Sequence, residues 1–433
     1  MKILEGKSTD SLLEILDEID SITKVDSVVK NGQKISIECI RENGHLKCWG
    51  VDADTNMLAD SIPFARGNKR DPFLATIDSM DEEAQLFDTM DCYVLCHLNT
   101  EAAKNWQGEI VSHWIRISPY QPYTIVGNKP EFEIVKLELS ESDYKVMMET
   151  KLSFYCKSTD ILYPLRTVSF PAVGKLLDCT SAFNRLDEHM LGSALLIAEK
   201  LSYQKNGIRF LSRSRGENVR PIISIVGHRY VHFPQKDFFK SALEIVKEQA
   251  GIYELGIDDV SKWSVSDEVT TLEIMFKSSH LLEYQPGLIV KTGDIAGTSL
   301  SVTAFIKIGK DYVYVKENSA LHTGTFDMNK LFEGIFESIS QTEEIYNFLS
   351  MNKCYFAEGE YTGAIFPILG KRRSQEVKPI TAGTYNCFAF YKLLVEATSQ
   401  HLPKKQYNML CRLYGEILNQ IFERTNELYM KEA

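Results

Sequence analysis

The sequence lacks the features that mark secreted or membrane-spanning proteins. Its nine cysteines are scattered over 433 residues and odd in number, whereas a secreted disulfide framework is denser. No apolar run approaches the ~20 residues that a membrane-spanning helix needs. The N-terminal segment has no continuous apolar core of the kind found in signal peptides. We therefore expect reduced thiols, a cytoplasmic location and no membrane contact.

Positive charge is also in short supply. The chain has 48 lysines and arginines against 59 aspartates and glutamates, which gives a net charge of -11. This excess argues against a protein that coats duplex DNA through bulk positive charge. A single-strand binder needs only a local basic track and some aromatic faces, so local clusters decide that question.

Motifs for common chemistries are absent. There is no phosphate-binding GxxxxGK[ST] loop, no G-x-S-x-G elbow, no H-E-x-x-H pair and no CxxC. Cys92, Cys96 and His97 have the side chains that zinc prefers, but both cysteines fall on one face of a predicted strand and no second pair lies nearby. A half-buried strand explains them better than zinc does, and we predict no metal and no cofactor.

Strand patterns dominate the first two thirds of the chain. Residues 34–40 and 45–51 flank Asn43-Gly44, the strongest short hairpin pattern. Alternating β-branched and aromatic residues predict further strands at 92–98, 109–117, 131–139, 221–226, 230–233, 270–278, 287–291, 299–308 and 311–317. Gly309-Lys310 predicts a tight turn, and residues 61–72, 204–220 and 369–380 are predicted loops.

Helical periodicity appears first after Ser11 and Glu14, which have capping-box spacing, and dominates the C-terminal third. Further helices are predicted at 185–203, 235–250, 328–350, 384–400 and 404–430. The fold class is therefore α+β, with antiparallel-rich sheets in the N-terminal and middle regions and a helical C-terminal third. We expect a β-rich domain at 1–165, an α+β domain at 166–350 and a helical region at 351–433.

The last helix has an apolar seam whose residues are spaced alternately four and three positions apart. These residues are Leu410, Tyr414, Ile417 and Ile421. Such a seam either packs on the chain's own core or forms a homo-oligomer through the C-terminal helix. Packing on the core is favoured, because Arg424 ends the seam early and a coiled coil usually sustains three or four heptads.

Local basic clusters are the candidate binding residues. Arginine forks bind phosphates, and neighbouring aromatic rings such as Tyr230 offer stacking faces for bases. The alternative is solvated surface loops. The candidates are Arg209, Arg213, Arg215, Arg220, Arg229, Tyr230, Lys371, Arg372 and Arg373, and Lys404 and Lys405 begin the last helix.

An ordered set of short motifs spans residues 219–340. Gly227-His228-Arg229-Tyr230 follows a predicted strand, and a helix comes next. A strand, a polar glycine-rich turn and a second strand occupy 286–306, before His322-Thr323-Gly324. This segment resembles the phage/plasmid-like family catalogued as domain of unknown function 932, although the chain departs from the family pattern at Ile308, Gly309 and Lys310. The motif positions are Gly227, Arg229, Tyr230, Gly293, Gly297, Ser299, His322, Thr323 and Gly324.

The resemblance implies a phage-type protein that acts inside a bacterial host cell, and it supplies no mechanism. The glycine-hydroxyl turn near Gly293 is either an anion-contacting edge or a hairpin turn capped by its own hydroxyls.

Three functions compete. We favour a non-enzymatic accessory protein that binds single-stranded nucleic acid in DNA replication or recombination. The alternative is a protein–protein module, such as a virion component, an assembly factor or an inhibitor of host defence, that binds a phage or host protein and no nucleic acid. An enzyme would have to use His228, His232 or His322 with a carboxylate such as Asp294, and no spacing supports a reaction type.

Overall fold

The computed structural model describes backbone and side chains for most of the chain. These residues are 3–27, 92–98, 114–118, 132–184, 190–201, 208–227, 230–257, 262–277, 284–293, 299–322, 327–399 and 402–430. For some further segments it describes the secondary structure of the backbone alone.

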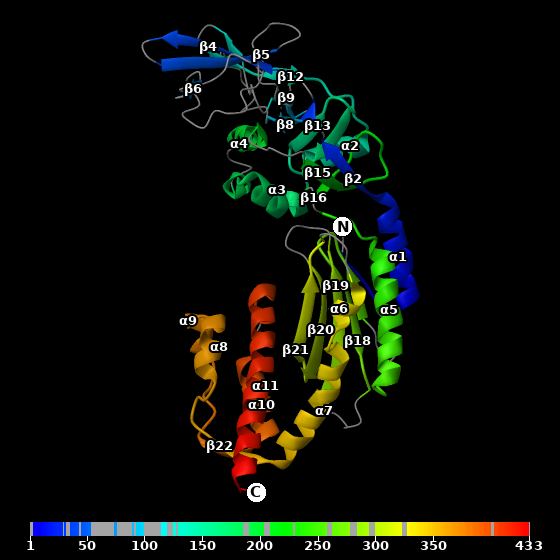
Figure 1. Cartoon of the computed structure of the whole chain (residues 1–433), viewed down its shortest axis with the longest axis vertical. Coiled ribbons are helices and arrows are strands. Elements are labelled where there is room, and N and C mark those ends of the chain that lie inside the picture. Colours follow the sequence, from blue (N-terminus) through cyan, green and yellow to red (C-terminus); the bar gives the residue numbers. More distant parts are fainter. Residues whose placement is uncertain are drawn as a thin grey trace. The chain divides into compact units, whose positions relative to one another are not determined.

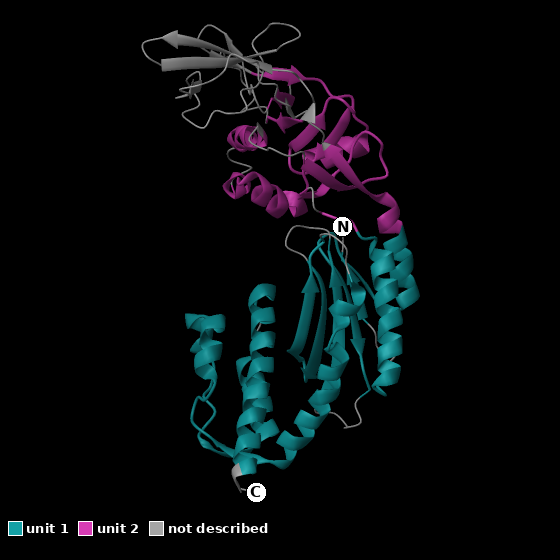
Figure 2. Cartoon of the chain, in the orientation of Figure 1, with its two compact units in different colours: residues 1–17, 233–293, 298–433 teal, residues 18–232, 294–297 magenta. Residues whose placement is uncertain are grey.

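The chain divides into two compact units (Figures 1 and 2). Unit 1 comprises residues 1–17, 233–293 and 298–433, and unit 2 comprises residues 18–232 and 294–297. The fold is α+β with antiparallel sheets, as predicted. The division differs from the three regions expected from sequence, because the C-terminal helices share one core with the strands of residues 285–320.

Unit 1 is built on a six-stranded antiparallel sheet in the order β1-β17-β18-β19-β20-β21. Its strands are β1 (Leu4–Gly6), β17 (Lys262–Val265), β18 (Thr270–Met275), β19 (Gln285–Thr292), β20 (Leu300–Ile308) and β21 (Asp311–Ala320). Gly309 has a φ of +59°, which permits the predicted tight turn between β20 and β21.

Unit 1 contains several helices, some of which cover one face and one edge of this sheet. They are α5 (Gln235–Ile252), α6 (Met328–Phe332), α7 (Ile335–Met351), α8 (Thr362–Leu369), α9 (Lys371–Ser374), α10 (Cys387–Thr398) and α11 (Lys404–Glu432). Helices α5, α6 and α7 contact the central strands, whereas α11 runs beside the edge strand β21 (Figure 1). A small hairpin pairs β22 (Lys353–Phe356) with β23 (Gly383–Asn386).

The seam of α11 packs into unit 1 itself. Leu410, Tyr414, Ile417 and Ile421 are all buried in a core that includes Val313 of the sheet. These side chains are therefore not available for a partner helix, and the interpretation as packing on the chain's own core is confirmed.

Unit 2 is formed around a five-stranded sheet, β12-β9-β8-β13-β14, and a three-stranded sheet, β16-β15-β2. The strands are β2 (Thr23–Val28), β8 (Tyr93–His97), β9 (Trp114–Ile117), β12 (Glu133–Val135), β13 (Leu152–Cys156), β14 (Ile161–Pro164), β15 (Ile208–Arg213) and β16 (Ile222–Val226). Stacked Phe154 and Phe210 join the two sheets at their core, with ring centroids 5.2 Å apart. The helices are α2 (Glu141–Met148), α3 (Phe170–Leu177) and α4 (Met190–Ser202), with short 3-10 turns at Thr167–Ser169 and Thr180–Phe183.

The remaining strands of unit 2 are small or described only by their backbone. The predicted hairpin is confirmed, because β4 (Ile35–Glu42) pairs with β5 (His45–Asp52) so that Glu42 faces His45. The turn residues themselves lie outside the described residues. The other strands are β3 (Lys30–Asn31), β6 (Phe73–Ala75), β7 (Thr89–Met90), β10 (Thr124–Val126) and β11 (Lys129–Glu131).

The helix start predicted at Ser11 was wrong. Helix α1 (Thr9–Ile22) begins two residues earlier, and the Ser8 Oγ accepts a hydrogen bond from the Ser11 backbone N–H at 3.4 Å. The predicted continuous helix at 328–350 is broken, because Gly334 adopts a φ of +67° between α6 and α7.

Two predictions near the arginine cluster were also wrong. Part of the predicted loop 204–220 is the strand β15, because Ile208, Phe210 and Leu211 are buried and the strand pairs with both β2 and β16. The predicted strand at 230–233 is not one: the chain there runs toward Pro234, the N-cap of α5. Among the described residues, no helix is long and apolar enough to cross a bilayer.

Candidate nucleic-acid interface

The arginines predicted to bind phosphates lie on and after β15 in unit 2. Arg220 forms an ion pair with Asp26 of β2, with Nη1–Oδ distances of 2.8 and 2.9 Å. Arg215 pairs with Glu18 of α1. Both charges are thus matched by carboxylates nearly two hundred residues earlier in the chain.

The other two arginines of this group also bond within unit 2. Arg209 donates from Nη1 to the Tyr230 carbonyl oxygen at 2.8 Å, and Arg213 donates from Nε to the Thr23 hydroxyl at 3.3 Å. The four arginines therefore connect β15 and the residues that follow it to α1, to β2 and to the segment after β16. Their main observed role is structural.

The basic segment of α9 lies in unit 1. Lys371 and Arg372 are exposed, and Arg373 is half-buried. These three residues belong to unit 1, whereas the arginines on and after β15 belong to unit 2. The two predicted basic clusters therefore do not share one unit.

The family-motif residues are only partly described. Gly227 directly follows β16, and its carbonyl oxygen accepts a hydrogen bond from the Tyr230 N–H at 3.1 Å. Gly293 is buried directly after β19, Ser299 precedes β20, and His322 is buried beside the Phe233 ring, with centroids 6.0 Å apart. His228, Arg229, Asp294, Gly297, Thr323 and Gly324 lie outside the described residues.

The cysteine pair considered for zinc is part of a packed strand. Cys92 and Cys96 are buried in the core of unit 2, and burial raises the pKa of Cys96 to about 12. A thiol held protonated in this way is a poor metal ligand. In the part of the chain that the structure describes, no group of three histidine, cysteine or acidic residues has the arrangement of a metal site.

A better binding surface is the polar face of the unit 1 sheet. Directly paired residues of an antiparallel sheet share a face, and here one row crosses all six strands. This row, which we call the polar row, consists of Glu5, Ser264, Thr271, Lys291, Ser301 and Ser319. The next row on the same face contains Lys262, Glu273, Ile289, Thr303 and Glu317.

The opposite face of the sheet is apolar. Its central row contains Trp263, Leu272, Val290, Val302 and Asn318. The helices pack on this side: the Thr270 hydroxyl donates to the Gln235 Oε1 of α5 at 2.7 Å, and the Asn318 amide donates to the Leu331 carbonyl before α7 begins. The polar row is therefore on the side away from these helices.

Helix α11 closes the edge of the sheet beside the polar face. The Tyr407 hydroxyl accepts a hydrogen bond from the Tyr312 N–H of β21 at 3.3 Å, and Gly415 lies against the Tyr314 carbonyl. Arg412 forms two hydrogen bonds with Glu317, at 2.6 and 3.0 Å. An edge strand covered in this way does not recruit another strand, and α11 adds basic side chains to the polar face.

Lys291 is the most unusual residue of this face. It is half-buried and, among the described residues, forms no ion pair or hydrogen bond. Burial and the neighbouring cation Lys404 lower its pKa, Glu317 opposes this, and Arg412 adds to it. Three cations thus lie near one carboxylate, which is already bonded to Arg412. We call Lys291, Lys404 and Arg412 the cationic cluster.

Two aromatic side chains, Phe305 and Tyr312, lie on the same face of the sheet, in the rows beyond Thr303 and Glu317. Gly287 leaves room for the Phe305 ring, because a Cβ at Gly287 would lie 2.6 Å from Phe305 Cζ. Tyr312 meets Phe305 edge to face at 5.0 Å, and the Lys307 ammonium lies 5.6 Å from the Tyr312 ring centroid. The Tyr312 hydroxyl is fixed by Glu273 at 3.0 Å. Phe305 is fully buried and supports the Tyr312 ring from below, so the accessible groups of this face include the cationic cluster, the exposed Ser319 and the half-buried Tyr312 and Lys307.

Comparisons with known proteins add no relative. No family model, no curated protein and no solved structure matches the chain.

Part of this surface could be predicted from the sequence, namely Lys404 as a basic residue at the start of the last helix and Ser299 in the polar segment before β20. Lys291 and Arg412 were not predicted, because each is a lone cation in its own segment. The alternation of Ser299, Ser301 and Thr303 was the available signal that β20 has one polar face.

Proposed function

We propose that the chain is a non-enzymatic nucleic-acid-binding protein that contacts the phosphates of a single strand with the polar face of the unit 1 sheet. The observation that carries this proposal is the cationic cluster, in which Lys291 is half-buried near Lys404 and Arg412 while the one carboxylate that acts on it, Glu317, is already bonded to Arg412. Like charges held together are unfavourable, and a bound anion relieves that cost. The family resemblance would place the activity in phage DNA replication or recombination.

The chemistry of the surroundings favours a phosphodiester. Ser319 is exposed at the end of the polar row and supplies a hydroxyl donor, whereas Ser301 beside Lys291 is buried. Tyr312 and Lys307 lie further along the same face, where they supply a ring and another cation. A single strand suits this surface better than a duplex, because the positive charge is local while the whole chain has a net charge of -11.

Fluorescence anisotropy of a labelled single-stranded oligonucleotide tests the proposal. We expect binding at low salt that weakens steeply as salt rises, because phosphate contacts release counterions. No binding at low salt with micromolar protein contradicts it. An unlabelled duplex of the same length is the competitor, and we expect it to compete more weakly than the single strand.

A second candidate is protein binding, supported by apolar side chains exposed in unit 1. Met351 at the end of α7 is 84% exposed, Tyr355 of β22 is 60% exposed, and Met430 near the end of α11 is 71% exposed. Exposed apolar patches mark interaction sites in many proteins. Light scattering after size exclusion distinguishes a monomer from an assembly. If Met351→Lys dissociates an assembly and no oligonucleotide binds, this second function replaces the first.

A further inference from the structure

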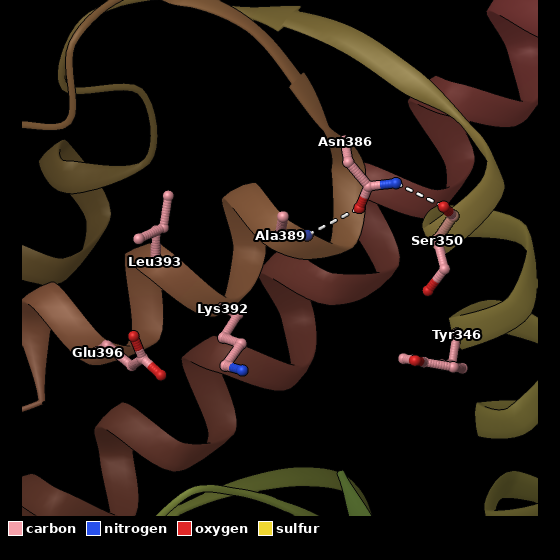
Figure 3. Close-up of a pocket in the computed structure, with 7 residues that line it drawn as sticks. All are labelled: Tyr346, Ser350, Asn386, Ala389, Lys392, Leu393 and Glu396. Atoms are coloured by element: carbon pink, nitrogen blue, oxygen red, sulfur yellow. Dashed lines mark hydrogen bonds between the residues drawn. The ribbon is translucent and has the colours of Figure 1, made fainter. Parts of the chain in front are cut away.

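Unit 1 has a hollow between α7 and α10 that plays no part in the polar sheet face. Its volume is about 590 Å³, within the range of small-molecule sites. Figure 3 shows its lining, which consists of Tyr346, Ser350, Asn386, Ala389, Lys392, Leu393 and Glu396.

Opposite charges line this hollow without pairing with each other. Lys392 and Glu396 are four residues apart on α10, and both line the hollow. Among the described residues neither forms an ion pair or a hydrogen bond. A lysine one turn before a glutamate is the less favourable order for an ion pair along a helix. Both charges are therefore available to a ligand.

The end of the hollow at the start of α10, away from Glu396, is shaped by Asn386. Its Oδ1 accepts a hydrogen bond from the Ala389 N–H at 3.0 Å, and its Nδ2 donates to the Ser350 carbonyl oxygen at 2.5 Å. Asn386 thereby caps α10 and ties it to the end of α7, as the dashed lines in Figure 3 show. Both polar atoms of its amide are thus engaged by the protein, so Asn386 is assigned to shaping the hollow.

Apolar surface lines the space between these ends. The Tyr346 ring is held between Tyr284 and Phe388, with centroid distances of 4.6 Å to each. Leu393 is 45% exposed although it is a large apolar residue. The Ser350 Oγ is buried and lacks a hydrogen-bond partner among the described residues.

We propose that this hollow binds a small zwitterion with an apolar side chain, such as a free amino acid. Its carboxylate would lie at Lys392, its ammonium at Glu396, and its apolar part against Tyr346 and Leu393. A ligand of this class satisfies both unpaired charges at once, whereas an anion or a cation alone satisfies one. The proposal is independent of nucleic-acid binding, because the two sites share no residue.

Three probes with the same branched apolar group separate the contributions of the ligand's ammonium and carboxylate to the affinity. L-leucine carries both charges, 4-methylpentanoate lacks the ammonium, and 3-methylbutylamine lacks the carboxylate. Ligand-observed NMR titrations with the full-length protein give the three dissociation constants. We expect L-leucine to bind up to about fivefold more tightly than either analogue, the upper end of what one exposed charge contact contributes.

Two variants connect that preference to the residues. Glu396→Gln should abolish the preference for L-leucine over 4-methylpentanoate, and Lys392→Met should abolish its preference over 3-methylbutylamine. Glu423→Gln and Lys405→Met make the same changes at exposed positions of α11 outside the hollow and should leave both preferences intact. Equal affinity for all three probes, or no binding of any at about 10 mM, overturns the proposal.

Discussion

The Arg412 guanidinium of α11 holds the Glu317 carboxylate of β21 through two hydrogen bonds, at 2.6 and 3.0 Å. This pair attaches the last helix to the edge strand of the sheet. It also engages Glu317, the carboxylate that acts electrostatically on Lys291, so that the lysine beside Lys404 has no ion pair of its own among the described residues. One contact thus links the packing of α11 to the charge of the polar face.

Removing that carboxylate should strengthen anion binding. In Glu317→Gln, Arg412 loses its counterion while all three cations of the cluster remain. We expect the affinity for a single-stranded oligonucleotide to rise severalfold at low salt, because one negative charge leaves the site. Glu423→Gln makes the same change elsewhere on unit 1. A weaker affinity in Glu317→Gln, with Glu423→Gln unchanged, would contradict the site.

The packing of α11 on β21 depends on Gly415. A Cβ at this position would lie 1.9 Å from the Tyr314 carbonyl oxygen, which is a backbone atom that cannot turn aside. We expect Gly415→Ala to lower the free energy of unfolding of unit 1 by about 3 kcal/mol or more. Urea denaturation measures the loss.

Gly192→Ala is the matched control for that change. Gly192 lies in α4, and nothing lies within 4 Å of its Cβ position. Alanine there should stabilise unit 2 by about 0.5–1 kcal/mol, because glycine is a poor helix former. Equal effects of the two substitutions would show that α11 does not approach β21 as described.

The arginines of β15 should affect stability more than binding. Arg220 is largely buried with Asp26, so Arg220→Ala leaves a carboxylate without its partner and should cost about 2–3 kcal/mol of unfolding free energy. Arg215 is 75% exposed, and Arg215→Ala should cost less than about 1 kcal/mol. Thermal denaturation compares the two. If Arg215→Ala instead abolishes oligonucleotide binding, the interface belongs to unit 2.

The buried thiols predict a loss of stability at alkaline pH. The folded pKa of Cys96 is about 12, above its ordinary value of 9.0, because burial disfavours the thiolate. Its contribution is therefore fully present below pH 9 and lost as pH rises toward 12, by roughly 4 kcal/mol over the whole window. Cys96→Val, which removes the proton but keeps an apolar side chain, should show a shallower decline between about pH 8 and 10 in urea denaturation. Identical declines in the two proteins would exclude Cys96 as the cause.

Local patterns predicted much of the fold. Alternation identified β8, β18, β19 and β20, and apolar periodicity identified α5 and α11. The errors arose where a single residue decided the outcome: Gly334 divides the helix predicted at 328–350, and Ser8 caps α1 in place of Ser11. Such positions depend on backbone conformation, which periodicity does not report.

The site was harder to predict because its contacts join distant segments. Arg215 and Arg220 resemble free phosphate ligands in the sequence, yet their partners lie 197 and 194 residues away. Lys291 becomes notable only when strand register places it beside Ser301 and when α11 brings Lys404 near it. Pairing between strands and the packing of a helix on an edge are long-range properties, and a single sequence does not specify their register.

The most direct test is the affinity of Lys291→Met for a labelled single-stranded oligonucleotide, measured by fluorescence anisotropy across a salt series. Methionine keeps the apolar stem and removes the charge, and Lys405→Met is the control at an exposed position outside the cluster. We expect Lys291→Met to bind about tenfold more weakly at low salt, with a salt dependence reduced by about 0.7 in log–log slope, the value of one lost phosphate contact. Lys405→Met should differ little from the original protein. If Lys291→Met binds with unchanged affinity and slope, the polar face of the unit 1 sheet is not the nucleic-acid interface.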